Sequence, residues 1–199
     1  MVKAEFRFVD EKAKLATQKV ILALPLICMG TVKLVNSVEE NTALMTPFMK
    51  NREMMQSRVQ AGFEAIKQIP NADISKVVAI GYCFGGLCVQ DLARVNSDVK
   101  GVVSVHGLMK QAPNISQGLF NSKVLLLHGS DDPMVSDDDW VALRKNQPSR
   151  LRLAKTQFGG VMHAFTNPQA NDKEMGTVYN ESANNRTEKL IADFIEECF

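Results

Sequence analysis

The hexapeptide at residues 81–86, Gly-Tyr-Cys-Phe-Gly-Gly, constrains the fold of this chain more than any other segment. An apolar run at residues 77–80 precedes it, and a stretch with helical character at residues 87–95 follows it. This order is typical of a strand that turns sharply into a helix and presents a nucleophile at the tip of the turn. Glycines permit the unusual backbone angles of such a turn, and the residue at its tip is Cys83.

Two segments downstream supply the residue types that activate a thiol. Residues 128–133 read His-Gly-Ser-Asp-Asp-Pro, and residues 159–165 read Gly-Gly-Val-Met-His-Ala-Phe. A histidine beside a cysteine deprotonates it near neutral pH, and the resulting thiolate attacks carbonyl carbon. The order of nucleophile, acid and histidine along the chain is a known order of hydrolytic triads. The sequence therefore predicts Cys83, Asp132 and His163 as the catalytic residues.

Other residues compete for two of these roles. His163 is preferred as the base because it lies in a loop after a predicted strand, behind a pair of glycines. His128 directly precedes a glycine turn and is expected to tie that turn together by hydrogen bonds. His106 ends a predicted strand, where it would either line the pocket or satisfy a backbone carbonyl. Asp131 and Asp132 are adjacent, and the sequence that follows favours Asp132 as the partner of the histidine.

Cys83 also has a plainer interpretation, because free cysteines are often small buried hydrophobes. The glycine turn and the downstream partners favour a nucleophile instead. The backbone N–H of Phe84 is predicted to stabilise an oxyanion, since it follows the nucleophile and heads a helix. No segment stands out as the second donor. A redox pair between Cys83 and Cys88 is disfavoured because residues five apart on a helix point to different faces.

Cysteine spacing argues against a metal site, and the net charge and the apolar segments argue against nucleic-acid and membrane partners. The four cysteines form no Cys-x-x-Cys pair, and none lies at zinc-like spacing from a histidine, so we expect no metal site. Reduced thiols fit a cytoplasmic protein. A net charge of +1 gives no bulk attraction to nucleic acid. The apolar stretch at residues 20–32 is too short to span a bilayer, so no membrane partner is expected either.

Hydrophobic periodicity predicts strands that alternate with helices through a single domain, residues 1–199. The apolar strand candidates favour a mainly parallel sheet covered by helices on both faces. Ligands on such sheets bind beyond the carboxyl ends of the strands, where Cys83, Asp132 and His163 would all lie. The expected strands are residues 2–9, 19–27, 76–80, 101–105, 123–127 and 151–157, and the main helices are residues 47–69, 85–95, 138–145 and 179–197. A capping box at residues 37–40 marks a further helix start.

Taken together, these motifs resemble the dienelactone hydrolase family, a cysteine-nucleophile branch of the α/β-hydrolase superfamily. The matching segments are the turn at 81–86, the acid loop at 128–133 and the histidine loop at 163–168, with further likeness at 47–52, 103–107 and 179–181. The likeness runs from about residue 19 to residue 199. It implies an α/β-hydrolase-like fold and hydrolysis of a small ester, lactone or thioester by Cys83, Asp132 and His163, with no cofactor.

The chain departs from the family pattern in ways that shape the expectations. The family's early strand, with a His-Glu pair in the loop after it, has no counterpart, so we expect a sheet that lacks the N-terminal strands. Its open edge would offer a route to self-association. Asn167 stands where the namesake enzyme has a substrate-binding arginine, so dienelactone itself is not the expected substrate. The alternative to an enzyme is a catalytically impaired descendant that binds a small molecule or a protein partner.

Overall fold

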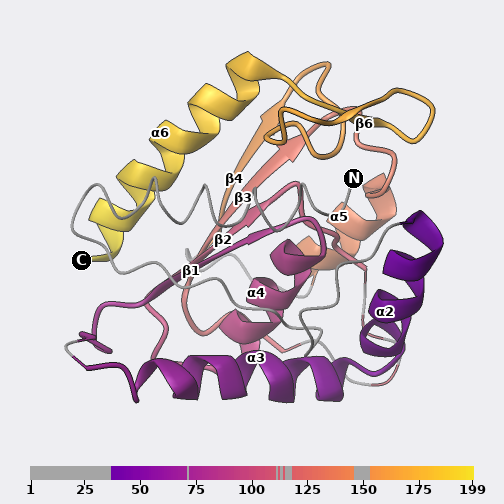
Figure 1. Ribbon diagram of the computed structural model, residues 1–199. Coiled ribbons are helices and arrows are strands. Elements are labelled where there is room, and N and C mark those ends of the chain that lie inside the picture. Colours follow the sequence, from indigo (N-terminus) through magenta and orange to yellow (C-terminus); the bar gives the residue numbers. More distant parts are fainter. Residues whose placement is uncertain (1–36, 71, 111, 113, 115–117, 146–152) are drawn as a thin grey trace.

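The computed structural model describes residues 37–70, 72–110, 112, 114, 118–145 and 153–199 (Figure 1). Its elements are α2 (Val38–Lys50), α3 (Arg52–Ile66), β1 (Val78–Tyr82), α4 (Phe84–Val95), β2 (Gly101–Val105), β3 (Lys123–Gly129), α5 (Asp137–Lys145), β4 (Leu153–Phe158), β5 (Asn171–Asp172), β6 (Thr177–Val178) and α6 (Glu181–Cys198). The strands expected at residues 2–9 and 19–27 lie outside the described residues. The expectation of a sheet that lacks the family's N-terminal strands depends on the same part of the chain.

Four parallel strands form the central sheet in the order β1-β2-β3-β4. Every residue of β2 is buried, as is all of β3 after its first residue, which explains why both read as unbroken apolar runs. Among the described residues β1 pairs with β2 alone. The predicted parallel α/β architecture is confirmed.

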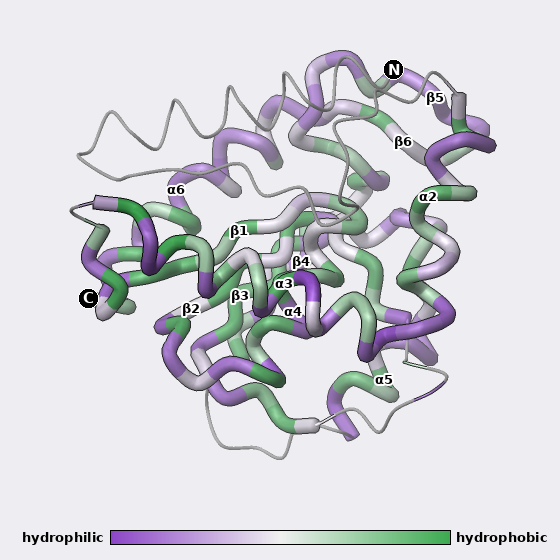
Figure 2. Tube along the Cα trace, turned by 60° about the horizontal axis from the view of Figure 1, so that its bottom comes forward, coloured by the Kyte–Doolittle hydropathy of each residue, from purple (hydrophilic) through white to green (hydrophobic). Residues whose placement is uncertain are grey.

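The sheet separates two hydrophobic cores, because successive side chains of a strand point to opposite faces. Val102, Val124 and Leu126 face the core shared with α3, α4 and α5. Val103 and Leu125, one residue along, face the second core, which contains Phe194 of α6. Figure 1 shows α6 on one side of the sheet and α3 and α4 on the other. The tube in Figure 2 shows hydrophobic residues concentrated in the strands, whereas α6 carries many hydrophilic ones.

The helix expected at residues 47–69 is in fact two helices, and this prediction was wrong about its start. Ser37 caps α2 by accepting a hydrogen bond of 3.1 Å from the Glu40 N–H, as the capping motif predicted. The Asn51 side chain then accepts from the Met54 N–H at 3.1 Å and begins α3. Pro47 lies inside α2 rather than at a helix start. A capping asparagine therefore divides what periodicity alone reads as one helix.

The helices of the described residues include none that is both long and apolar enough to cross a membrane. The longest, α6, carries charged residues along most of its length and uses one stripe to cover the sheet. This arrangement is typical of a helix that packs on a core by one face and exposes the other.

Candidate active site

Cys83 stands at the tip of the turn between β1 and α4. Its backbone is in the left-handed region, with φ 50° and ψ −119°, an unusual conformation for a residue with a side chain. A Cβ on Gly81 would overlap the Gly85 carbonyl, and one on Gly86 would come within 2.6 Å of the Gly107 Cα. The turn is thus too tight for side chains at these positions. The predicted strand–turn–helix with a cysteine at its tip is confirmed.

His163 lies in the loop that follows β4 and is fixed there by a small hairpin, β5 and β6. Its N–H donates to the Gly176 carbonyl at 2.9 Å, and its carbonyl accepts from the Val178 N–H at 3.0 Å. The ring is therefore held by backbone hydrogen bonds on both sides of its Cα. Sequence reasoning did not anticipate this hairpin, because its strands have only two residues each and show no periodicity.

The histidine loop meets the acid loop through Asp132. His163 Nδ1 lies 2.8 Å from Asp132 Oδ2, and both side chains are buried. The other carboxylate oxygen of Asp132 accepts from the Met134 N–H at 2.9 Å, which fixes the carboxylate in its turn. Asp131 is exposed and instead accepts a hydrogen bond from Ser130. Of the two competing aspartates, the structure brings Asp132 to the histidine.

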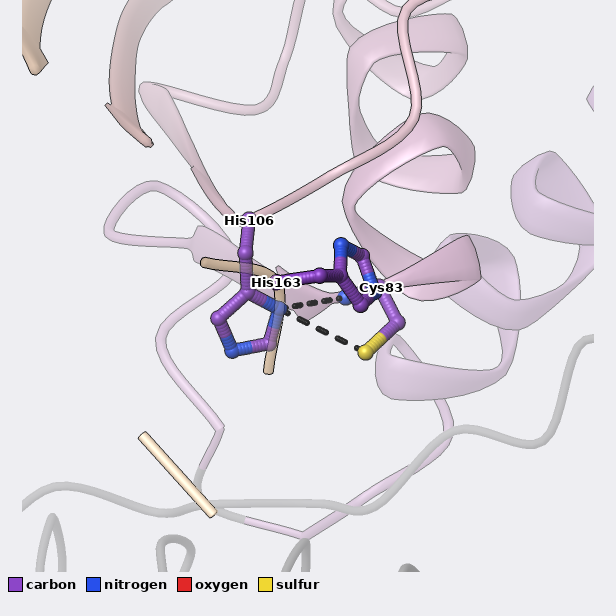
Figure 3. A group of neighbouring side chains, drawn as sticks. All are labelled: Cys83, His106 and His163. Atoms are coloured by element: carbon purple, nitrogen blue, oxygen red, sulfur yellow. Dashed lines mark hydrogen bonds between the residues drawn. The ribbon is translucent and has the colours of Figure 1, made fainter. Parts of the chain in front are cut away.

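His106 lies between the Cys83 turn and the histidine loop, beside the thiol. Its Nδ1 lies 3.4 Å from Cys83 Sγ and 3.3 Å from the Cys83 backbone nitrogen (Figure 3). Its Nε2 lies 2.8 Å from the Thr166 hydroxyl. The Cys83 N–H donates to both the Val105 carbonyl, at 3.2 Å, and His106 Nδ1, so we infer that the proton of a neutral His106 is on Nε2. Of the two roles expected for His106, lining the site is the one found.

Cys83, His106 and His163 each present one donor atom, and these three atoms lie within 4.8 Å of one another. In Figure 3 the rings of both histidines flank the Cys83 side chain. Burial lowers the pKa of His163, but the Cys83 thiolate and the hydrogen bonds with Asp132 and Cys83 outweigh it and raise the pKa to about 10. The arrangement therefore favours a protonated imidazolium at His163.

His128 does not play the part expected of it. It is 1% exposed, and neither ring nitrogen makes a hydrogen bond among the described residues. Its Nε2 lies 3.5 Å from Asp132 Oδ2, and its ring packs edge-on against Trp140 at 5.1 Å between centroids. Burial lowers the pKa of His128 to about 4, although the charge of Asp132 opposes this. The prediction that His128 ties its turn together by hydrogen bonds was wrong.

Phe84 and Cys88 lie where the turn places them. Phe84 is the first residue of α4, so its N–H has no acceptor within the helix and heads the positive end of the helix dipole. Cys88 is 1% exposed and belongs to the core between the sheet and α3. It is not among the groups gathered around Cys83 in the described residues.

The comparisons with known proteins point to one family. The model of the dienelactone hydrolase family matches residues 12–199. The uncharacterized Caenorhabditis elegans protein K02A2.1 is 31% identical over 149 residues, which cover 73% of this chain and 94% of that protein.

Among solved structures, the dienelactone hydrolase-like promiscuous phosphotriesterase P91, from metagenomic libraries, superposes with a TM-score of 0.74 at 29% identity. This match covers 86% of the present chain and 72% of P91. The structure of m3DLH has the same fold, with a TM-score of 0.73 at 24% identity over 84% of this chain and 70% of that one. The α/β-hydrolase fold, the elbow cysteine and the family match lead to one conclusion: the chain belongs to the dienelactone hydrolase family.

Proposed function

We propose that the protein hydrolyses small esters, lactones or thioesters by acyl transfer through Cys83, His163 and Asp132. The observation that carries this proposal is the meeting of a strained elbow thiol with a histidine whose far nitrogen is held by a buried carboxylate. Nucleophile, base and orienting acid are the three parts that such catalysis requires. Family membership supports hydrolysis in general, and the site supports the finer assignment to carboxylic esters.

In the first half of the reaction, the Cys83 thiolate attacks the carbonyl carbon and forms a carbon–sulfur bond. The negative charge moves to the carbonyl oxygen, where the free N–H of Phe84 at the head of α4 stabilises it. The intermediate then collapses, the bond to the leaving alkoxide or thiolate breaks, and His163 gives that group its proton. Asp132 holds the ring in the orientation that this transfer needs.

The second half reverses the roles of the histidine. Acylation removes the thiolate charge that contributes to the raised pKa of His163, so the pKa falls and the neutral ring accepts a proton from water. The hydroxide equivalent attacks the thioester carbon, the carbon–sulfur bond breaks, and the acid product leaves. Cys83 is left as a thiolate beside a protonated His163, as at the start. No step needs a cofactor.

The competing hypothesis is a family member that binds a small molecule or a protein partner but has lost catalysis. Kinetics on an activated aryl ester separate the two. Wild-type protein should turn over the ester, Cys83→Ala should lose that turnover, and Cys198→Ala should keep it, because Cys198 lies on α6 among the residues of the second core. Equal turnover by the wild-type and Cys83→Ala proteins would refute the proposal.

Thiol labelling supplies a measurement that needs no substrate. We expect iodoacetamide to modify Cys83 faster than Cys88 or Cys198, because a thiolate beside an imidazolium reacts faster than a neutral thiol. Peptide mass mapping after short exposures gives the three rates from one sample. Slow labelling of Cys83 at the rate of Cys198 would favour the binding protein over the enzyme.

P91 is described as a promiscuous phosphotriesterase, and its 29% identity to this chain makes a phosphotriester the second substrate class to test. The same thiolate can attack phosphorus, with expulsion of an aryloxide in place of the alkoxide. Assay of an aryl phosphotriester beside the aryl ester, with the Cys83→Ala protein as the control for both, decides whether one nucleophile serves the two reactions.

A further inference from the structure

We propose that Cys83, His106 and His163 together bind one zinc ion, and that this binding reversibly blocks the nucleophile. The set joins a thiolate to two imidazoles, the ligands that zinc prefers in proteins. Cysteine spacing could not reveal it, because the three residues come from separate segments of the chain and meet only through the fold. The proposal concerns binding of a cation and does not depend on turnover of any substrate.

The distances suit a tetrahedral ion. Zinc–sulfur and zinc–nitrogen bonds of about 2.3 Å and about 2.0–2.1 Å put the ligand atoms of a tetrahedral site about 3.3–3.6 Å apart. Cys83 Sγ and His106 Nδ1 are already 3.4 Å apart. All three donor atoms lie within 4.8 Å of one another, so small side-chain rotations complete the geometry.

Both histidines already have the outer partners that zinc-bound histidines usually have. His163 donates its Nδ1–H to Asp132, so Nε2 is the atom that would bind zinc, after it releases the proton that it holds toward Cys83. His106 holds its Nε2–H toward the Thr166 hydroxyl, so Nδ1 lies near both the sulfur and the Cys83 N–H. Zinc would replace the hydrogen bond from that N–H, which keeps its bond of 3.2 Å to the Val105 carbonyl. Outer partners of this kind fix the ring orientation and make the other nitrogen a better ligand. The cluster is thus oriented for a cation before any cation arrives.

The charge of the cluster and the exposure of its ligands also suit a zinc ion. The Cys83 thiolate and the Asp132 carboxylate together offset the two positive charges of the ion. Zinc would displace the Nε2 proton of His163, so that both rings bind as neutral groups. His106 and His163 are 1% and 4% exposed, and Cys83 is only half-buried, so the open fourth position would lie on the side of the sulfur. A water molecule there would complete the site. Binding would occupy the sulfur and the Nε2 of His163, which are the atoms that acyl transfer needs.

Cobalt spectroscopy tests the proposal directly, because Co²⁺ takes zinc sites and its bond to a thiolate absorbs in the near ultraviolet. Reduced, chelator-treated wild-type protein should bind one equivalent of Co²⁺ with a thiolate charge-transfer band, and zinc should displace it. Cys83→Ser should abolish the band. His106→Gln should weaken Co²⁺ binding at least about tenfold. Cys198→Ser should bind as the wild-type protein does.

The wild-type protein alone keeps the test decisive if a variant folds poorly. A wild-type spectrum without the charge-transfer band would overturn the proposal. So would a band that survives alkylation of Cys83, as verified by peptide mass mapping, or a folded His106→Gln protein that binds Co²⁺ as tightly as the wild type. Where turnover is measurable, micromolar zinc should inhibit it and a chelator should restore it, and the His106→Gln protein should need at least about tenfold more zinc.

Discussion

Two polar clusters of this protein differ in composition and in the backbone that carries them. The first joins Arg52 of α3 to Asp91 and Arg94 of α4. Arg52 makes two hydrogen bonds to the Asp91 carboxylate, at 2.8 and 2.6 Å, and a third to the Lys110 carbonyl at 2.9 Å. Arg94 adds a further bond of 3.0 Å to Asp91. The second cluster is the site at Cys83, where donor atoms face one another across a half-exposed thiol.

The two clusters also differ in backbone conformation. Among the described residues, the non-glycine residues with positive φ are Cys83, His106 and Ala164, at 50°, 38° and 55°. Two belong to the site and the third directly follows His163, whereas the arginine cluster lies on regular helices. Strained backbone persists only where the surrounding structure enforces it, and it gathers at functional sites. Regular helical backbone therefore marks the structural cluster, and strained backbone marks the reactive one.

The largest difference between the clusters should appear in catalysis. Replacement His163→Gln should lower kcat/KM for an aryl ester about 10⁴-fold or more, because it removes the group that carries the proton in both halves of the reaction. Steady-state kinetics measure the loss. Chemical denaturation should show that the variant still folds cooperatively. A loss of kcat/KM of less than tenfold in a folded variant would show that His163 is not the catalytic base.

The arginine cluster should respond in the opposite way. Asp91→Asn should lower the free energy of unfolding by about 3–5 kcal/mol, because it leaves the charges of two buried arginines without their carboxylate. The kcat/KM of the folded protein should change less than about threefold, since the cluster touches none of the reacting groups. Asp98→Asn, at an exposed position, is the matched control and should cost less than about 0.5 kcal/mol. Denaturant titrations measure the loss of stability, and steady-state kinetics measure kcat/KM for the same variants. A large catalytic effect of Asp91→Asn would contradict a purely structural role for the arginine cluster.

His128 gives a pH-dependent test within the site's own surroundings. Its pKa in the folded state is about 4, below the ordinary value of 6.5, so the folded protein binds fewer protons than the unfolded chain between these values. Stability should therefore fall as pH drops from about 6.5 to about 4, by on the order of 3 kcal/mol from this residue. The His128→Phe protein should lose this part of the pH dependence. The difference between the two unfolding curves across this window is the measurement, and identical slopes would contradict it.

The smallest expected effect concerns the hydroxyl behind His106. Thr166→Val removes the partner of the buried Nε2 and should cost about 1–2 kcal/mol of stability. It should also weaken Co²⁺ binding about tenfold, because the ring is no longer held with Nδ1 toward the sulfur. Thr166→Ser should restore both quantities. A Thr166→Val protein that loses stability but binds Co²⁺ normally would give Thr166 a structural role only.

Much of the fold could be predicted from the sequence because its signals are local. The strand at residues 101–105 is found as expected. The glycines around Cys83 were enough to predict the turn between strand and helix. The predicted helix boundaries were wrong where a capping residue sets them, as at Asn51, because capping depends on one side chain rather than on periodicity. The hairpin that holds His163 is too short to leave a pattern.

The candidate site was predictable in its long-range partners and less so in its immediate surroundings. Motif order, the glycine pair before His163 and the sequence after Asp132 selected Asp132 and His163, which the structure brings together at 2.8 Å. The contact of His106 with the thiol could not be read from the sequence, because it depends on where β2 ends relative to β1 in the sheet. The lack of hydrogen bonds at His128 likewise depends on packing against Trp140 from another segment.

The central claim is that the sulfur of Cys83 carries the acyl group during turnover. Rapid quenching of the wild-type protein with an activated acetyl ester, followed by peptide mass mapping, tests it most directly. We expect one acetyl group on Cys83, formed within the first turnover and lost as product appears. Steady turnover with Cys83 unmodified at every time point, or with the acetyl group on another residue, would contradict it.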